Sequence, residues 1–273
     1  MKICWQVSNR VLYEQITYYK SVNFKGKHVL ITGGSRGIGK ATALAFATQG
    51  AVVGINYRSN TAAAEKTLKE LQGEGHCAFK YDISNKAEAK DLIDDFVETY
   101  GRIDVLVNNA GISIPHDMET VNFEEWTSAF ENTFQTNLFA VANLSYLTAK
   151  EMMKTGGGHI VSVSSRGAFR GEPTKPAYGA SKAALNAMSQ SLAKRLAPHD
   201  IYVGVVAPGF TDTEMGAKTL TPVERENLLR ESPFKRMAKP EEVAHAVLFL
   251  ASSEAAYSSG TIIDVNGASY LRS

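Results

Sequence analysis

The chain has 273 residues, of which 44% are hydrophobic, and this is enough to bury one large core without requiring a second domain. Its formal net charge of +1 and the even scatter of its charged residues give no broad basic face, which argues against nucleic acid or an anionic membrane as a partner. Because its two cysteines match no metal or redox spacing, and no apolar run approaches the ~20 residues of a membrane span, we expect a cytoplasmic protein.

The first 24 residues stand apart from the rest of the chain. Apolar residues recur there at helical spacing, at Val7, Val11, Leu12, Ile16 and Tyr19. We expect an amphipathic extension over residues 1–24 that lies on the body or on a neighbouring subunit. A helix on a membrane surface is the alternative, and the sparse positive charge of the stretch counts against it.

From residue 27 onward, short β-branched runs alternate with longer helical stretches. The runs that read as strands cover residues 28–32, 51–56, 76–82, 103–111, 158–165, 201–209 and 260–267. Strands that alternate with helices in this way pair in parallel and are covered on both faces. The sequence therefore predicts an α/β fold with a doubly wound, seven-stranded parallel sheet, in a single domain over residues 25–273.

The first of these runs leads directly into the loop Thr32-Gly33-Gly34-Ser35-Arg36-Gly37-Ile38-Gly39 and then into a helix. Glycines allow a tight turn and let the backbone approach a pyrophosphate, whose charge is stabilised by the N–H groups at the helix start. A sharp strand-to-helix connection also needs glycine, so it is the order of strand, loop and helix that favours dinucleotide binding. The residues expected to contact the cofactor are Gly33, Ser35, Arg36, Gly37, Ile38 and Gly39.

The spacing of these glycines resembles the TGxxxGxG loop of the short-chain dehydrogenase/reductase family. The resemblance extends from residue 25 to the C-terminus, through several motifs in the family's order. It implies a Rossmann-type sheet and further cofactor contacts after the third, fourth and sixth strands, although each motif alone also fits ordinary turn chemistry. These contacts are Asp82, Ile83, Asn109, Ala110, Gly111, Pro208, Gly209, Thr211 and Thr213.

The end of the second strand indicates which nicotinamide cofactor binds. An acidic side chain there accepts hydrogen bonds from the ribose 2'-OH of NAD and repels a 2'-phosphate. In this chain Tyr57 stands where NAD-preferring relatives usually carry Asp, Arg58 follows it, and Arg36 lies in the glycine loop. Guanidinium groups offer forked, charged donors to a phosphate, so NADP(H) is the expected cofactor unless both arginines are ordinary solvated charges.

Tyr178 and Lys182 are four residues apart at the start of a helical stretch and therefore share one face of it. Since an ammonium favours a nearby phenolate, we expect Lys182 to lower the pKa of Tyr178 toward the working range. The pairing alone is common by chance, and it is the family resemblance that identifies both residues as catalytic. The resemblance further implies that Ser165 holds the substrate oxygen, with the adjacent Ser164 as its rival. It also implies that Asn137 holds a water that links the lysine to solvent.

These four residues predict the reduction of a carbonyl to a secondary alcohol. Ser165 and Tyr178 bond the substrate oxygen, Tyr178 gives up its proton, and Lys182 holds the nicotinamide ribose. No metal is required, and the sequence shows no His, Cys and Asp cluster that would bind a catalytic one.

The longest stretch without an assignable strand, at about residues 211–240, follows the sixth strand and is punctuated by Pro222 and Pro233. Ligands of open α/β sheets bind beyond the carboxyl ends of the strands. We therefore expect a substrate lid here, and a packed surface excursion is the alternative.

Within the family, the chain looks most like 3-oxoacyl-[acyl-carrier-protein] reductases, but such reductases tend to carry arginines where this chain has Gly156 and His199. The segment over residues 113–123 is also longer than is usual in such reductases. Three hypotheses remain: a reductase of 3-oxoacyl thioesters, a reductase or dehydrogenase of another ketone or alcohol such as a sugar, polyol or steroid, and a non-catalytic dinucleotide-binding regulatory protein.

The resemblance also implies a homotetramer or homodimer, joined through the helix that carries Tyr178 and through the last strand.

Overall fold

Seven aliphatic segments form one parallel sheet in the computed structural model, which describes residues 22–214, 221, 226 and 229–272. The strands are β1 (His28–Thr32), β2 (Val52–Tyr57), β3 (Cys77–Lys80), β4 (Val105–Asn108), β5 (Gly158–Val163), β6 (Ile201–Pro208) and β7 (Ile262–Val265). Neighbouring strands all run parallel, in the order β3-β2-β1-β4-β5-β6-β7. The predicted doubly wound sheet is confirmed, and each strand overlaps the run that predicted it.

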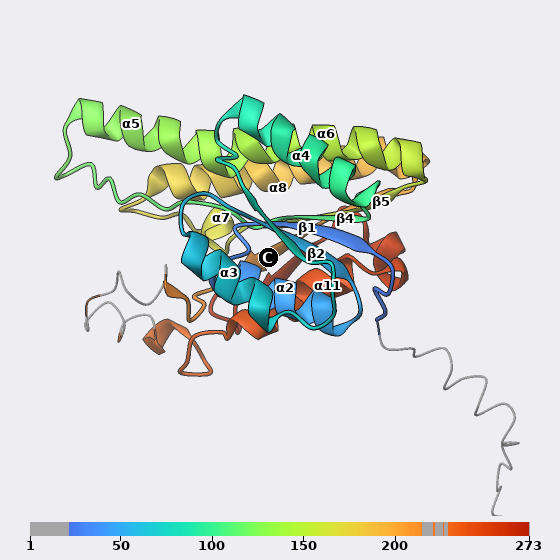
Figure 1. Cartoon of the computed structure of the whole chain (residues 1–273). Helices are drawn as coiled ribbons and strands as arrows, with labels where there is room; N and C mark the ends of the chain where they lie inside the picture. Colours follow the sequence, from blue (N-terminus) through green and yellow to red (C-terminus); the bar gives the residue numbers. More distant parts are fainter. Residues whose placement is uncertain (1–21, 215–220, 222–225, 227–228, 273) are drawn as a thin grey trace, which may run out of the picture.

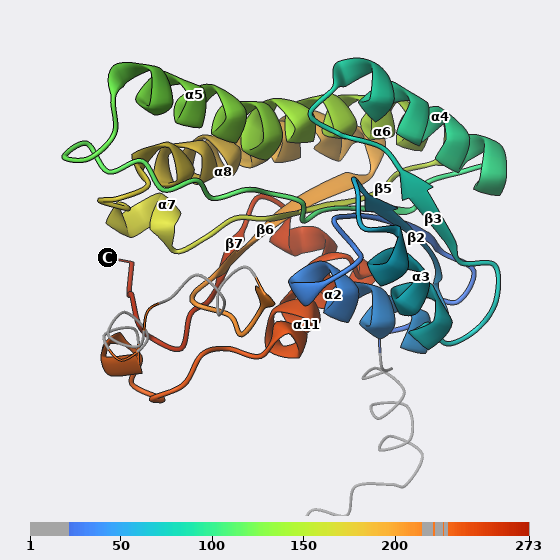
Figure 2. The same cartoon turned by 60° about the vertical axis from the view of Figure 1, so that its left-hand side comes forward.

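Helices cover both faces of this sheet. In chain order they are α2 (Gly37–Thr48), α3 (Thr61–Glu70), α4 (Lys86–Tyr100), α5 (Phe123–Phe134), the π-helical turn η1 (Gln135–Phe139), α6 (Ala140–Thr155), α7 (Gly167–Arg170), α8 (Pro176–Leu196), the 3-10 turn η2 (Ala197–His199), α11 (Pro240–Leu250) and the 3-10 turn η3 (Ser253–Ser258). Figures 1 and 2 show α2, α3 and α11 on one face, with α4, α6 and α8 on the other. The chain therefore forms three layers, and the carboxyl ends of the strands remain at one edge.

Alternate side chains of the central strands enter two separate apolar layers. Val29 and Ile31 of β1 pack with Phe46 of α2 on one face. Leu30 points the other way and packs with Phe96 of α4. All five side chains have 0% exposure, and each contributes roughly 1.5–3 kcal/mol to folding by its removal from water.

The direction in which the chain winds through the sheet reverses between β1 and β4. These two strands are hydrogen-bonded neighbours although β2 and β3 separate them in the sequence. The loop after β1 leads to α2 on one face, and the loop after β4 leads toward α5 and α6 on the other (Figure 2). Such a reversal is where open α/β sheets bind ligands, so it positions the candidate site.

The start of the described chain joins the core directly. The ring of Phe24 meets that of Phe46 edge-on, with the ring centroids 4.7 Å apart. Most of the predicted N-terminal extension, residues 1–21, lies outside the described residues. Within the described ranges, no helix has both the length and the hydrophobicity needed to cross a bilayer.

Candidate functional site

The glycine loop after β1 folds back so tightly that side chains would not fit. Gly33 and Gly37 have φ angles of 63° and 55°, a left-handed conformation that glycine adopts without strain. A Cβ atom on Gly39 would lie 2.3 Å from the carbonyl oxygen of Gly33. Arg36, the residue before α2, makes no side-chain capping bond, so the first N–H groups of α2 are open to an anion.

Thr32 ties this loop to the end of β4. Its Oγ1 accepts hydrogen bonds from the N–H groups of Asn109 and Ala110, both at 3.0 Å. The side-chain amide of Asn109 donates in return to the carbonyl oxygens of Thr32 at 2.9 Å and Gly33 at 3.2 Å. The two loops at the reversal point are therefore one hydrogen-bonded unit. The sequence analysis named Thr32 as the start of the loop but assigned no contact to it.

The segment after β6 reaches the same loop from the other side. A Cβ on Gly37 would lie 3.3 Å from Cγ2 of Thr213, and Arg36 forms an ion pair with Glu214 at 3.7 Å. Thr211 pairs with Ala238 in an isolated parallel bridge. Pro208 and Gly209, at the carboxyl end of β6, complete the predicted contacts on this side. Of the predicted lid at about 211–240, the stretches 215–220, 222–225 and 227–228 lie outside the described residues.

At the end of β2, the two predicted residues face different ways. Tyr57 is buried in the core that contains Ile55, and its hydroxyl is 3.4 Å from Oγ1 of Thr61, so any contact from position 57 to a nucleotide would come from its backbone. Arg58 is exposed and pairs with Asp82 at 3.8 Å. Asp82 is therefore partly exposed beside Arg58, whereas Ile83 next to it is buried.

Ser165 and Tyr178 meet at the carboxyl end of β5. The Ser165 hydroxyl lies near enough to the Tyr178 phenol to oppose the rise in its pKa, and its Oγ accepts a bond from the N–H of Gly167 at 3.0 Å. Ser164 points the other way and donates to the carbonyl oxygen of Lys182 at 3.3 Å. The alternation of side chains along a strand thus places Ser165, and not Ser164, beside the tyrosine.

The lysine does not act on the phenol as expected. Lys182 is buried, its Nζ donates to the carbonyl oxygen of Val163 at 2.8 Å, and it lies 6.0 Å from the centroid of the Tyr178 ring. Burial lowers the pKa of Lys182 from 10.5 to about 8. Burial also raises the pKa of Tyr178, which the Ser165 hydrogen bond opposes and the charge of Glu172 reinforces. Lys182 is not among the causes of this shift, so the predicted lowering of the tyrosine pKa by the ammonium is not seen in this structure.

Asn137 lies in the π-helical turn η1, at the centre of the site, and not in regular helix. Its Oδ1 accepts from the N–H of Ile112 at 2.8 Å, and its Nδ2 donates to the carbonyl oxygen of Ile112 at 2.9 Å and to Ser181 at 3.1 Å. A Cβ on Gly111 would lie 3.1 Å from Oδ1 of Asn137 and 3.4 Å from Nζ of Lys182. Gly111 therefore lets the asparagine and the lysine approach the same point. Single π turns of this kind occur frequently at functional sites.

Sequence reasoning missed Arg166, which follows the serine directly. Its guanidinium is buried and bonds to Glu231 at 2.8 Å and to Ser269 at 2.6 Å. It also stacks on the ring of Phe210, 4.6 Å from the centroid. The Arg166 guanidinium thus links its own segment, after β5, to three others. These are the segment after β6, the end of the predicted lid and the C-terminal segment. Its position beside Ser165 was the only signal in the sequence.

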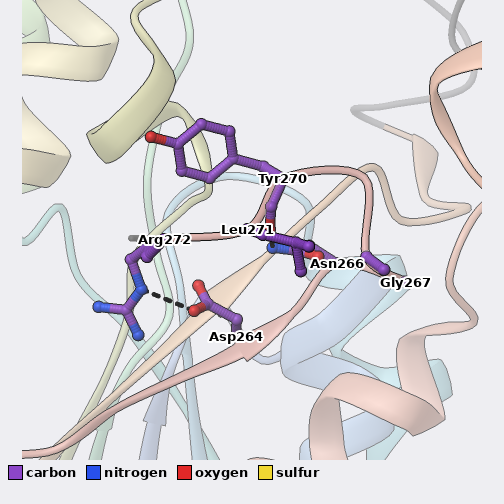
Figure 3. A pocket seen from close by; sticks show the side chains of 7 residues that line it. Asp264, Asn266, Gly267, Tyr270, Leu271 and Arg272 are labelled. Atoms are coloured by element: carbon purple, nitrogen blue, oxygen red, sulfur yellow. Dashed lines mark hydrogen bonds and ion pairs between the residues drawn. The ribbon is translucent and has the colours of Figure 1, made fainter.

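Two pockets lie at the carboxyl end of β7. The larger, of about 450 Å³, is lined by Asp264, Asn266, Gly267, Ala268, Tyr270, Leu271 and Arg272. Figure 3 shows the ion pair in it, in which Nε of Arg272 donates to Asp264 at 2.7 Å. The smaller, of about 200 Å³, is lined in part by Arg166 and Phe210. Neither pocket is lined by Ser165 or Tyr178, so neither pocket contains the candidate catalytic residues.

Comparison with known proteins gives concordant matches. The family model described as "Enoyl-(Acyl carrier protein) reductase" matches residues 33–268. The 3-oxoacyl-[acyl-carrier-protein] reductase of Thermotoga maritima is 39% identical over 248 residues, which are 90% of this chain and 98% of that protein. The Escherichia coli protein of the same name is 37% identical over 251 residues, or 92% of this chain and all of its own length.

Two solved structures are similar to the whole body of the chain. A short-chain dehydrogenase from Burkholderia cenocepacia in complex with NADP superposes with a TM-score of 0.81, at 31% identity, over 90% of this chain and 98% of its own. A 7α-hydroxysteroid dehydrogenase complexed with NADH and 7-oxo glycochenodeoxycholic acid gives a TM-score of 0.83 at 34% identity, over 90% and 94% of the two chains.

Proposed function

The chain belongs to the short-chain dehydrogenase/reductase family, and on this premise we propose that it is an NADPH-dependent oxidoreductase that reduces a carbonyl to a secondary alcohol. The observation that carries the proposal is that Ser165, Tyr178 and a buried Lys182 come together at the edge of the sheet where the glycine loop also lies.

The glycine loop fits a dinucleotide. Glycine at position 39 lets the loop fold back on itself, because a Cβ there would clash with the carbonyl oxygen of Gly33, and the start of α2 has N–H groups without a side-chain cap. These groups would hold the pyrophosphate, and Asp82 at the rim would bond the adenine. When bound, NADPH supplies the hydride for the reduction. A structural neighbour in complex with NADP supports the same cofactor.

Tyr178 is the candidate proton donor for the reduction. Its phenol carries a proton at neutral pH, so it can donate a hydrogen bond and then its proton to the oxygen of a carbonyl substrate. The hydroxyl of Ser165 supplies a second donor to the same oxygen and stabilises its developing charge. Lys182, whose pKa is lowered to about 8, gains and loses a proton near neutral pH and is suited to pass protons onward. As in other family members, it would also hold the nicotinamide ribose.

We propose 3-oxoacyl thioesters as the substrates, because the relatives that match nearly the full length are 3-oxoacyl-[acyl-carrier-protein] reductases. A second candidate, another cyclic or aliphatic ketone, is favoured by the similarity to the 7α-hydroxysteroid dehydrogenase and by the absence of a cation at Gly156, which caps α6. A regulatory protein without turnover would not need the ordered Ser165–Tyr178 contact.

The substrate proposal is tested by NADPH oxidation with acetoacetyl thioesters of carrier protein and of coenzyme A, beside a panel of simple ketones, sugars and oxo-steroids. We expect the highest kcat/KM with a thioester. A higher value for any other ketone would replace the thioester proposal and keep the reductase. No oxidation with any substrate would favour the regulatory reading.

Replacing Arg58 by alanine is expected to raise the KM for NADPH by roughly 10- to 100-fold, because a charged hydrogen bond to the 2'-phosphate is lost. The KM for NADH should change by less than about threefold, since NADH has no such phosphate. Arg195→Ala, an exposed arginine of α8, is the control. Steady-state kinetics with both cofactors measure this, and a wild-type preference for NADH would contradict the assignment.

We also propose that the chain assembles as a homodimer or homotetramer. Phe139, Tyr146 and Met153 are exposed at seven-residue intervals along α6 and its preceding turn, which places them on one side of that helix. β7 is an edge strand that pairs only with β6 in the described part of the chain. Both features support association with a second copy, which the mass in solution would report.

A further inference from the structure

His116 is a buried histidine in the loop between β4 and α5, and it is 1% exposed. Its Nδ1 is 2.7 Å from the carbonyl oxygen of Ile114, and its Nε2 is 3.1 Å from the backbone N–H of Ala177. A carbonyl oxygen can only accept a hydrogen bond and a backbone N–H can only donate one. The ring is therefore neutral and carries its proton on Nδ1, which leaves Nε2 as the acceptor.

The N–H that His116 accepts belongs to the first turn of the helix that carries Tyr178. α8 begins at Pro176, and Lys175 before it makes no side-chain capping bond. The first N–H groups of a helix have no partner within the helix, and a capping side chain normally accepts from the second or third of them. Ala177 is the second residue of α8. His116, from a segment distant in the sequence, therefore accepts the hydrogen bond that a capping side chain at Lys175 would normally accept.

The imidazole is itself held in place from several directions. Trp126 and Phe130 of α5 meet it edge-on, with ring centroids 5.3 and 5.4 Å away. The backbone N–H of His116 donates to the carbonyl oxygen of Thr174 at 2.9 Å. Earlier in the same loop, Asn137 bonds both backbone groups of Ile112. The loop thus connects Asn137 at one end to the start of α8 at the other.

We propose that His116 is a positioning residue for the proposed general acid. By fixing the N–H of Ala177, it sets the first turn of α8 and with it the place of the adjacent Tyr178 phenol relative to Ser165. This inference rests on the proposed function of Tyr178 as proton donor. A histidine that served only packing would contribute to stability without affecting kcat.

Three variants test the proposal. His116→Phe keeps an aromatic ring but removes the acceptor, and we expect kcat to fall by roughly 10- to 100-fold, because small displacements of a reacting group have effects of this size. The KM for NADPH should stay within about threefold, since the glycine loop is untouched. His116→Gln restores an uncharged acceptor and should recover most of the lost kcat. Should His116→Phe not fold, His116→Asn replaces it, because its shorter amide does not reach Ala177.

His76 provides a matched control. Its Nδ1 accepts from the backbone N–H of Val53 at 3.0 Å and its Nε2 is 2.9 Å from the carbonyl oxygen of Gln72, so it makes the same two kinds of bond away from the site. His76→Phe should lower the melting temperature but leave kcat unchanged.

The inference is overturned if His116→Phe retains kcat within about twofold of wild type while Tyr178→Phe is inactive. It is also overturned if the Gln variant loses as much kcat as the Phe variant. Should Tyr178→Phe remain active instead, the proposed function itself fails, and the role of His116 falls with it.

Discussion

Replacing Tyr178 by phenylalanine is expected to lower kcat by roughly a thousandfold or more, because it removes the group that protonates the substrate oxygen. The change deletes one oxygen atom and leaves the ring in place. Ser165 would remain as a hydrogen-bond donor to the substrate, so residual turnover above the uncatalysed rate is expected.

The measurement is NADPH oxidation at saturating substrate, together with NADPH affinity by fluorescence titration. Affinity should change by less than about threefold, since the glycine loop proposed to hold the pyrophosphate is left unchanged. Tyr257→Phe, which removes the hydroxyl of an exposed tyrosine on η3, is the matched control and should leave kcat unchanged. Near wild-type turnover in Tyr178→Phe would show that the assignment of the proton donor is wrong.

Replacing Lys182 by methionine is expected to abolish most activity and at the same time to stabilise the protein. The ammonium is buried with only the carbonyl oxygen of Val163 as its hydrogen-bond acceptor in the described chain, and this burial lowers its pKa from 10.5 to about 8. A shift of this size corresponds to about 3 kcal/mol of unfavourable free energy at neutral pH. Methionine fills similar space without a charge, so the free energy of unfolding should rise by about 2–4 kcal/mol, while kcat falls by roughly a hundredfold or more.

The stability that Lys182→Met gains over the wild-type protein should depend on pH in a definite direction. Below about pH 8 the folded wild-type protein carries the buried ammonium, and the unfavourable term is fully present. As the pH rises from about 8 toward 10.5, the unfolded chain still binds the proton that the folded protein has released, so wild-type stability increases. The advantage of Lys182→Met should therefore shrink over this interval.

Urea unfolding at several pH values measures this prediction. Lys194→Met, an exposed lysine on the same helix, should change neither stability nor kcat. An equal stability of the Lys182 and Lys194 variants at every pH would contradict the buried-charge argument. A Lys182→Met protein that kept its turnover would remove the lysine from the proposed mechanism.

The parallel sheet could be predicted from the sequence because its signals are local. β-branched runs such as 28–32 and 201–208 alternate with helical stretches, and both periods are visible in a few residues. That only one of Ser164 and Ser165 faces the tyrosine also follows from a local rule, because neighbouring side chains of a strand face opposite ways, while the family resemblance indicated Ser165. The glycine loop was also recognisable, because its backbone folds back too closely for any side chain. A Cβ on Gly39 would lie 2.3 Å from the carbonyl oxygen of Gly33, so only glycine fits there.

What the sequence did not predict depends on contacts between distant segments. The pKa of Tyr178 is raised by burial that the whole fold imposes, and the four-residue spacing to Lys182 contains no information about it. Tyr57 turns into the core because Ile55, on the same side of β2, is a core residue too. His116 bonds to Ala177 across 61 positions of the chain, and Arg166 bonds to Ser269 across 103. A local sequence pattern contains no information about contacts between residues so far apart in the chain.

The transfer of a deuterium label tests the central claim most directly. The protein is incubated with NADPH that carries deuterium at its transferable position and with an acetoacetyl thioester or the best ketone of the panel, and the product is examined by mass spectrometry and NMR. The account predicts one deuterium on the new carbinol carbon, formed by the wild-type protein and almost absent with Tyr178→Phe. An unlabelled alcohol, or oxidation of the cofactor without any alcohol, would contradict it.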